Sequence, residues 1–188
     1  PTSLGTMHMR SAYPIPKRIV GFPKLLRDAG YYTSNNVKTD YNIRDPGPFI
    51  EACWNENSSQ AHWRNRPNKQ MPFFAVFNLM ESHQSRSMAW ISEKFEQEIR
   101  SQLPEERCHS PASVRLPSFY VDTPVVRREW ARYHDCVSVM DLQVGRILKQ
   151  LKEDGLADNT IVFFFGDHGA GMPRHKRALL DSGTHVPL

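Results

Sequence analysis

The 188-residue sequence predicts an α/β fold, a mostly parallel mixed sheet flanked by helices. Two continuous apolar runs, 73–80 and 161–165, have the composition of strands that are buried on both faces. Between them, apolar residues recur at spacings of three and four from 126 to 151, which is typical of a long amphipathic helix. Buried strands that alternate with amphipathic helices favour a sheet whose strands run parallel.

The chain before the first apolar run contains a predicted helix and a predicted strand. Residues 1–20 have no clear period, so we expect a loop. From Phe22 to Ala29 the apolar side chains lie on one side of a short helix, and Gly30 is a natural end for it. Residues 31–34 (YYTS) are β-prone and predict a strand. Together these form half of an αβ unit.

The remaining segments are less patterned. Residues 45–72 are rich in Asn, Pro, Arg and Trp and predict no particular element. Residues 86–107 predict a helix or a surface insertion, and residues 116–124 an extended arm. Asp154 and Gly155 close the long helix. No internal repeat and no low-complexity tract is present.

Composition excludes some classes of function. The 24 basic and 20 acidic residues give a net charge of +4, and they are mostly interleaved, so nucleic acid is not the expected partner. No apolar run approaches the roughly 18–20 residues of a membrane span. The three cysteines, Cys53, Cys108 and Cys136, form no CxxC pair and no disulfide framework, and Cys136 is expected to lie in the core. Oligomeric state is not determined by the sequence.

Candidate site residues follow each predicted strand. Lys38 follows the first strand, His83 the second, and Asp167 and His168 the third. Ligands of open α/β sheets bind at the carboxyl ends of the strands, so this recurrence indicates one site. Asp167 and His168 lie between two glycines and offer an oxygen and a nitrogen ligand to a metal, although an Asp there can also cap a turn.

A basic run at 174–177 (RHKR) completes the predicted site. Lysine supplies a mobile point charge and arginine a planar fork, and both suit a tetrahedral oxyanion such as sulfate or phosphate. Ordinary structural interpretations stay open: a solvated Lys38, a His83 that bonds the backbone, and a solvated basic run. No GxSxG, P-loop or HExxH motif supplies a nucleophile.

Several segments resemble the central and C-terminal part of the sulfatase catalytic domain. Residues 163–169 (FFFGDHG) resemble the family strand that ends in S-D-[NH]-G, and residues 181–188 (DSGTHVPL) resemble the segment that ends in [RH]-V-P-[LM]. Counting back from that segment places Lys176 on the family's sulfate-contacting lysine. Residues 22–31 are similar to the L-x-x-x-L-[RK]-x-x-G-Y-x-T unit, and residues 133–148 to the helix with D-x-x-[VI]-G-x-[IL]-L.

This resemblance implies roles for individual residues. Lys38 stands at the lysine of the family's G-K-W-H, whereas Asp40 stands where histidine is commonest. His83 matches a histidine that contacts substrate, and Asp167 matches a metal ligand. His168 stands where many sulfatases have Asn and still offers a ligand atom. The metal implied is Ca²⁺ or another divalent cation.

The resemblance also implies an alkaline-phosphatase-like fold and a fragment that is incomplete at both ends. Residues 1–188 are then a single partial catalytic domain without the N-terminal nucleophile and metal segment and without the C-terminal subdomain. The nucleophile would be a formylglycine made from a C/S-x-P/A-x-R signature upstream, and residues 1–6 look like the stretch just beyond it. The fragment alone is expected to be inactive.

For the full-length protein, the resemblance implies hydrolysis of a sulfate ester or sulfamate on a small molecule or glycan, and a periplasmic, secreted or lysosomal location. Alternatives are a phosphodiesterase or phosphonate-ester hydrolase of the same superfamily, a non-catalytic anion- or glycan-binding pseudoenzyme, and an α/β domain without a site. Five aromatic and cationic side chains could line a sugar pocket or pack a surface insertion: Tyr13, Trp54, Trp63, Arg64 and Arg66. His8 and Arg10 could also contact the substrate.

Overall fold

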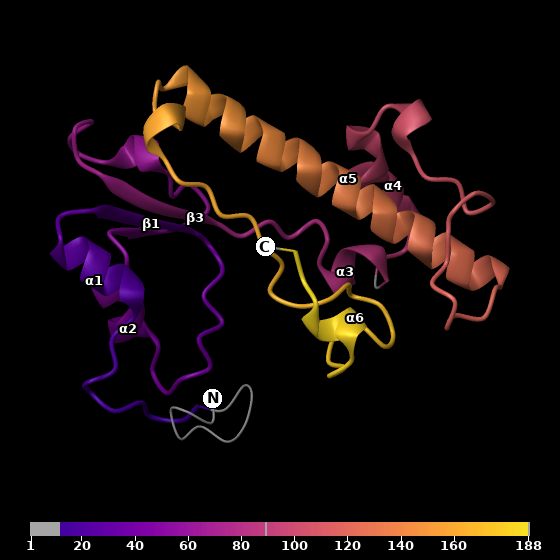
Figure 1. Ribbon diagram of the computed structural model, residues 1–188, viewed down its shortest axis with the longest axis horizontal. Helices are drawn as coiled ribbons and strands as arrows, with labels where there is room; N and C mark the ends of the chain where they lie inside the picture. Colours follow the sequence, from indigo (N-terminus) through magenta and orange to yellow (C-terminus); the bar gives the residue numbers. More distant parts are fainter. Residues whose placement is uncertain (1–11, 89, 188) are drawn as a thin grey trace. The chain divides into compact units, whose positions relative to one another are not determined.

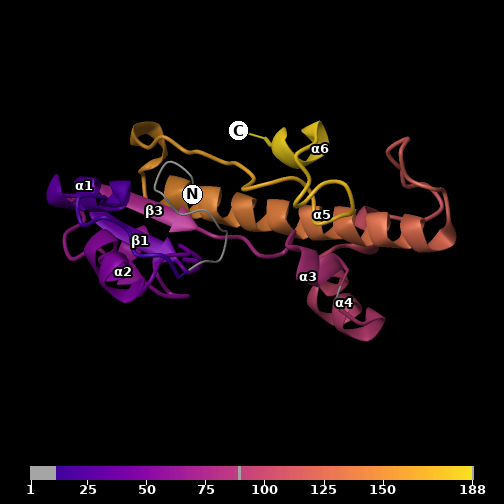
Figure 2. The same cartoon turned by 90° about the horizontal axis from the view of Figure 1, so that it is seen from below.

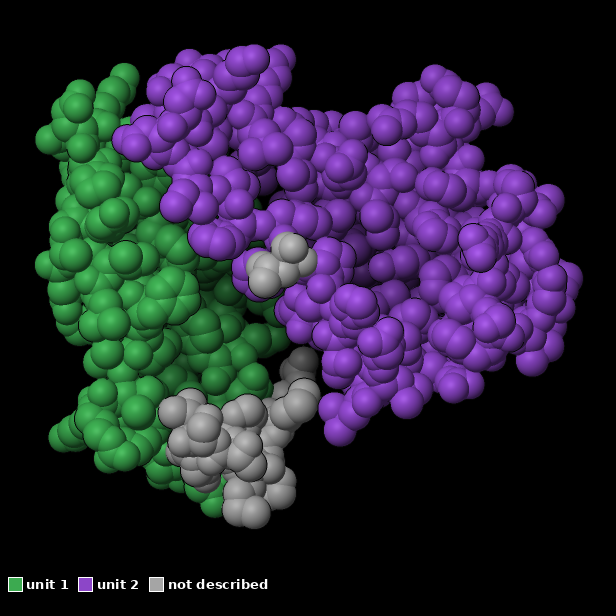
Figure 3. Space-filling model, viewed as in Figure 1, with its two compact units in different colours: residues 1–78 green, residues 79–188 purple. Residues whose placement is uncertain are grey.

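The computed structural model of the chain describes residues 12–88 and 90–187. The stretch 1–6 and the candidates His8 and Arg10 lie outside these residues. The chain forms two compact units, residues 1–78 (unit 1) and 79–188 (unit 2), which Figure 3 shows in different colours. None of the described helices is long and apolar enough to cross a membrane.

Unit 1 contains a three-stranded parallel sheet with the order β2-β1-β3 (Figure 1). The central strand β1 (Tyr32–Asn36) pairs along its whole length with β3 (Phe73–Phe77) and at two positions with β2 (Glu56–Asn57). Helices α1 (Phe22–Asp28) and α2 (Gly47–Cys53) contact each other, and α1 also contacts β1. The α/β class and the parallel sheet are confirmed.

The predicted helix and strand at the start of unit 1 are confirmed. Pro23 lies in the first turn of α1, where its missing N–H costs nothing. Gly30, with φ of 90°, ends the helix in a left-handed conformation that glycine adopts without a steric penalty. The apolar face of α1 is not buried, however, because Phe22 and Leu25 are 62% and 58% exposed.

The weakly patterned segment 45–72 folds around two buried tryptophans. Trp54 stacks on Phe74 with ring centroids 5.9 Å apart, and Trp63 stacks on Phe73 at 5.8 Å. The segment contains α2, β2 and a 3₁₀ turn, none of which its sequence pattern predicts. Since both indole rings pack inside unit 1, they do not line a sugar pocket.

Unit 2 is organised on the 30-residue helix α5 (Pro124–Glu153), which confirms the predicted long helix. The Thr123 hydroxyl accepts a hydrogen bond from the Val126 N–H at 3.3 Å and caps the helix start. Gly155, with φ of 69°, follows the helix end. The shorter helices are α3 (Gln84–Ser87), α4 (Ser92–Glu98) and α6 (Asp181–Thr184). Residues 116–124 have no strand and no helix before Pro124, as expected of an extended arm.

Two hydrophobic clusters form on α5. Figures 1 and 2 show α4 and α6 on opposite sides of this helix. Buried residues of α4, of the turn after it and of α5 make the first cluster: Phe95, Ile99, Leu103, Cys136 and Val139. Residues from three separate segments make the second: Val114, Trp130 and Met172. Cys136 is thus a core residue, as predicted.

The third predicted strand, 161–165, is wrong. The backbone there is irregular, and the five side chains are exposed, from 47% for Phe164 to 81% for Ile161. A strand needs neighbours that satisfy its N–H and C=O groups, and no strand of the described residues pairs with this run. Similarly, β3 covers only part of the run 73–80, and its side chains are half-buried rather than buried on both faces.

Candidate active site

Lys38 leaves the sheet at the carboxyl end of β1, where a buried asparagine orders the chain. The Asn35 amide donates to the Lys38 carbonyl at 3.0 Å and to Asn57 Oδ1 at 2.6 Å, and Asn35 Oδ1 accepts from the Asn78 amide at 2.8 Å. One side chain therefore joins the ends of the strands to the segment that carries Lys38. Sequence reasoning missed Asn35, whose only mark is its place at a strand end.

The lysine head group lies close to Asp40. Lys38 Nζ is 3.9 Å from Asp40 Oδ2, and Asp40 has a left-handed φ of 34°. Both side chains are partly exposed, so this ion pair contributes little to stability. The ion pair keeps the Lys38 ammonium group near the carboxyl end of β1.

His83 begins α3 and caps it. Its Nδ1 accepts a hydrogen bond from the Ser85 N–H at 3.3 Å and lies 2.8 Å from Ser85 Oγ. Because a backbone N–H only donates, this bond assigns the proton of the neutral ring to Nε2. His83 Nε2 lies 3.4 Å from Lys176 Nζ. The two residues of unit 2 that the resemblance assigns to sulfate, His83 and Lys176, therefore lie next to each other.

The basic run 174–177 sends its side chains in different directions. The Arg174 guanidinium lies 4.7 Å from the centre of the Phe119 ring. His175 is turned toward Ser182, with Nδ1 3.0 Å from that carbonyl oxygen. Lys176 reaches His83, so the run is not a uniformly solvated stretch.

Two glycines allow the basic loop to approach its neighbours. A Cβ on Gly171 would lie 2.7 Å from Gln84 Cα and 3.0 Å from Gln84 N, at the start of α3 beside His83. A Cβ on Gly183 would overlap the carbonyl oxygens of His175 and Ala178. Only glycine fits such backbone contacts. These glycines place the loop against α3 and α6.

Asp167 and His168 form a pair of possible metal ligands. His168 Nδ1 lies 2.8 Å from the Gly169 carbonyl, so it donates there and leaves the Nε2 lone pair available. That Nε2 is 3.6 Å from Asp167 Oδ2, and the Asp167 side chain is 70% exposed. Among residues 12–88 and 90–187, no third His, Cys, Asp or Glu joins them. Calcium takes about six to eight oxygen ligands, so this pair by itself does not make a calcium site.

The two pairs of unit 2 are joined through one loop. Asp167 and His168 precede Ala170, whose carbonyl accepts a hydrogen bond from the Lys176 N–H at 2.9 Å. Lys38 belongs to unit 1, so its convergence with these four residues stays a prediction.

The cysteines are poor nucleophiles. Burial, with a smaller contribution from the Asp135 charge, raises the pKa of the Cys136 thiol to about 12. Burial also raises the pKa values of Cys53 and Cys108. Since the thiolate is the reactive form, none of the three is activated.

Comparison with known proteins identifies the family. The family model described as Sulfatase matches residues 2–188. The chain belongs to the sulfatase family. It is 34% identical, over 224 aligned residues, to an ulvan-active sulfatase of Formosa agariphila, covering 100% of this chain and 37% of that protein. It is 26% identical to human N-acetylgalactosamine-6-sulfatase over 192 aligned residues, which is 88% of this chain and 37% of that protein. The chain thus spans little more than a third of these relatives.

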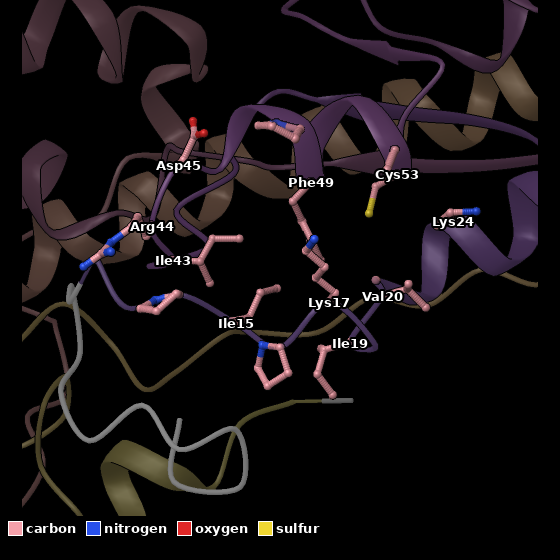
Figure 4. Close-up of a pocket in the computed structure, with 15 residues that line it drawn as sticks. Ile15, Lys17, Ile19, Val20, Lys24, Ile43, Arg44, Asp45, Phe49 and Cys53 are labelled. Carbon is pink, nitrogen blue, oxygen red and sulfur yellow. The ribbon is translucent and has the colours of Figure 1, made fainter.

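A depression of about 390 Å³ in unit 1 of this sulfatase chain holds none of the predicted site residues. Figure 4 shows its lining, which includes apolar Ile15, Ile19 and Phe49 beside the charged Lys17 and Arg44. The candidate site is therefore defined by side-chain contacts and not by this cavity.

Proposed function

We propose that this sulfatase chain binds the sulfate group of a sulfated carbohydrate and supports hydrolysis of the ester. The observation that carries the proposal is the 3.4 Å approach of His83 Nε2 to Lys176 Nζ. With Nδ1 accepting from the Ser85 backbone, the neutral imidazole and the ammonium both present hydrogen-bond donors. Two neighbouring donors attract an oxyanion that accepts from both.

These donors have a clear task in sulfuryl transfer. A transferred sulfuryl group spreads negative charge over its oxygens much as a phosphoryl group does, so positioning and positive charge lower the barrier. Lys176 would neutralise one sulfate oxygen and His83 would orient another. Lys38 would add a third donor at the carboxyl end of β1.

Asp167 and His168 would hold a divalent cation, Ca²⁺ by family resemblance. When bound, such an ion polarises the sulfate oxygens and the attacking oxygen. The exposed Asp167 carboxylate suits Ca²⁺, which prefers oxygen ligands, whereas the available His168 Nε2 is a nitrogen ligand that suits other divalent cations better. The formylglycine nucleophile stays a prediction of the resemblance.

A carbohydrate substrate is supported by the names of the relatives, an ulvan-active sulfatase and an N-acetylgalactosamine-6-sulfatase. These names describe the substrates of the relatives and not the sugar that this chain binds. The periplasmic, secreted or lysosomal location stays a prediction of the resemblance.

The test is kinetic. In the full-length protein that carries this sequence, Lys176→Ala should lower kcat/KM for a sulfate ester about 100-fold or more, as removal of an oxyanion donor does. Arg146→Gln, on the exposed side of α5, is the matched control and should leave kcat/KM unchanged. A Lys176→Ala enzyme within a few-fold of the parent would refute the assigned contact. The same assay with an aryl phosphate in place of an aryl sulfate distinguishes a sulfatase from the phosphodiesterase alternative.

A double-mutant cycle tests Lys38. If Lys38 and Lys176 bind the same sulfate group, the losses from Lys38→Ala and Lys176→Ala should be non-additive by more than about 0.5 kcal/mol. Additive losses would place Lys38 outside the site. Calorimetric titration with calcium chloride, in which Asp167→Ala should weaken binding, tests the metal pair without an activity assay.

A further inference from the structure

Arg174 occupies an unusual position in the basic loop. It is exposed, and its backbone has a left-handed φ of 65°, which few non-glycine residues adopt. The Ser182 hydroxyl donates to the Arg174 carbonyl at 2.6 Å, and the Tyr120 hydroxyl donates to the carbonyl of the preceding Pro173. The loop is therefore tied down on both sides of the Arg174 peptide.

The Arg174 guanidinium rests on an aromatic platform, defined as Phe119, Tyr120 and Trp130. The guanidinium lies 4.7 Å from the Phe119 ring centre, and the Phe119 and Tyr120 rings are 5.0 Å apart. Tyr120 contacts Trp130 of α5 edge-on at 5.4 Å, and Trp130 is buried in the second hydrophobic cluster. The platform connects an exposed cation to the core, so the guanidinium is held in place before any ligand binds.

Arg174 differs from two other arginines of unit 2, Arg100 and Arg127, in its acidic neighbours. Arg100 pairs with Asp135, and Arg127 pairs with Asp122. No carboxylate of the described residues pairs with Arg174. Burial raises the pKa of Tyr120 and the nearby Arg174 charge opposes that rise, so the positive field of Arg174 reaches the platform. The Phe119 ring lies against one side of the guanidinium, so N–H groups on its other sides are available to a planar or tetrahedral anion.

We propose that Arg174, seated on Phe119, binds a second anionic group of the substrate, a carboxylate or sulfate on the sugar next to the one whose sulfate ester meets Lys176. Arg174 and Lys176 are two residues apart, so their Cα atoms lie within about 7.6 Å. Their side chains diverge, one to Phe119 and one to His83. The substrate class is then a polyanionic glycan rather than an isolated sulfate monoester, a conclusion that rests on the proposed function.

The experiment compares two sugars by calorimetric titration of the full chain. One probe is N-acetylgalactosamine 6-sulfate, with one anionic group, and the other is the uronate-containing chondroitin 6-sulfate disaccharide, with two. The parent chain should bind the disaccharide about ten-fold more tightly, which is about 1.4 kcal/mol. Arg174→Gln should remove this preference and leave affinity for the monosaccharide unchanged.

Control variants separate this proposal from the proposed function. Arg146→Gln, an exposed arginine on α5, should leave both affinities unchanged, and Arg174→Lys should keep only part of the preference because it retains charge without the planar fork. Lys176→Ala should weaken the binding of both sugars by the same factor. An Arg174→Gln chain that keeps the preference, or a parent chain without one, overturns the role of Arg174. Unchanged monosaccharide binding in Lys176→Ala overturns the proposed function instead, and no binding of either sugar overturns both.

Discussion

Two regions of unit 2 are held in place in opposite ways. The packed region, α4 with the turn that follows it on α5, buries Phe95, Ile99 and Val139 almost completely. The site segment, residues 161–187, exposes its apolar run and is positioned by glycine contacts and loop hydrogen bonds. The comparison indicates that the packed region supplies stability, whereas the site segment exposes the candidate ligand-binding groups.

Two aspartates show the same contrast. Asp135 is fully buried, and its carboxylate accepts from Arg100 Nε at 2.8 Å and from the His109 N–H at 2.7 Å. Asp167 is mostly exposed, with His168 as its neighbour at 3.6 Å. A buried carboxylate with several donors stabilises a fold, while an exposed one remains available to a ligand.

The largest expected difference between the regions comes from phenylalanine truncation. Phe95→Ala should lower the free energy of unfolding by about 3–5 kcal/mol, because it empties a packed site under the Arg132 guanidinium. Phe163→Ala should change it by no more than about 0.5 kcal/mol, because Phe163 is 72% exposed. Urea unfolding of the two variants checks this. A large loss in Phe163→Ala would show that the run 161–165 is buried in solution.

The second largest difference between the regions is expected from replacing each of the two aspartates by asparagine. Asp135→Asn should cost about 2–3 kcal/mol, because Arg100 loses its charged partner and one buried donor loses an acceptor. Asp167→Asn should leave stability within about 0.5 kcal/mol while weakening calcium binding. The same urea unfolding series, with calcium titration beside it, measures both. Equal losses from the two variants would remove the distinction between the regions.

Glycine substitution tests how the site segment is positioned. Gly171→Ala should cost about 1–3 kcal/mol, because its Cβ would lie 2.7 Å from the Gln84 backbone and would push the basic loop from α3. Gly145→Ala, in the middle of α5 with open space around it, is the control and should stabilise the chain by about 0.5–1 kcal/mol. Thermal unfolding ranks the two, and a neutral Gly171→Ala would argue against the close contact.

The smallest expected effect is a pH dependence of the packed region. Burial and then the His109 charge lower the pKa of His134 below its usual value, against an opposing Asp135 contribution. The unfolded chain therefore takes up a proton before the folded one, so stability is lost as pH falls through about 6.5. His134→Gln should flatten the fall in unfolding free energy between pH 7.5 and about 5.5. An unchanged slope would show that other titratable groups cause the pH dependence of stability.

The sequence predicted both the helix α5 and a strand at 161–165, yet only the helix formed. A helix satisfies its backbone within its own segment, so the periodicity of the apolar residues suffices to predict it. A strand takes its hydrogen bonds from other segments, so composition alone cannot place it in a sheet. The composition of β1 and β3 predicted strands, whereas β2 and the order β2-β1-β3 depend on partner segments and were not predicted.

The sequence by itself determined the α/β class, the long helix and the family, because these depend on local period and motif spacing. By resemblance to the family it also predicted the candidate site residues, which are Lys38, His83, Asp167, His168 and Lys176. Tertiary structure alone decided that Lys176 meets His83, that Arg174 stacks on Phe119, and that Asn35 orders the end of β1. Those contacts join residues far apart along the chain, or depend on where a loop folds back. Spacing in one dimension carries no such information.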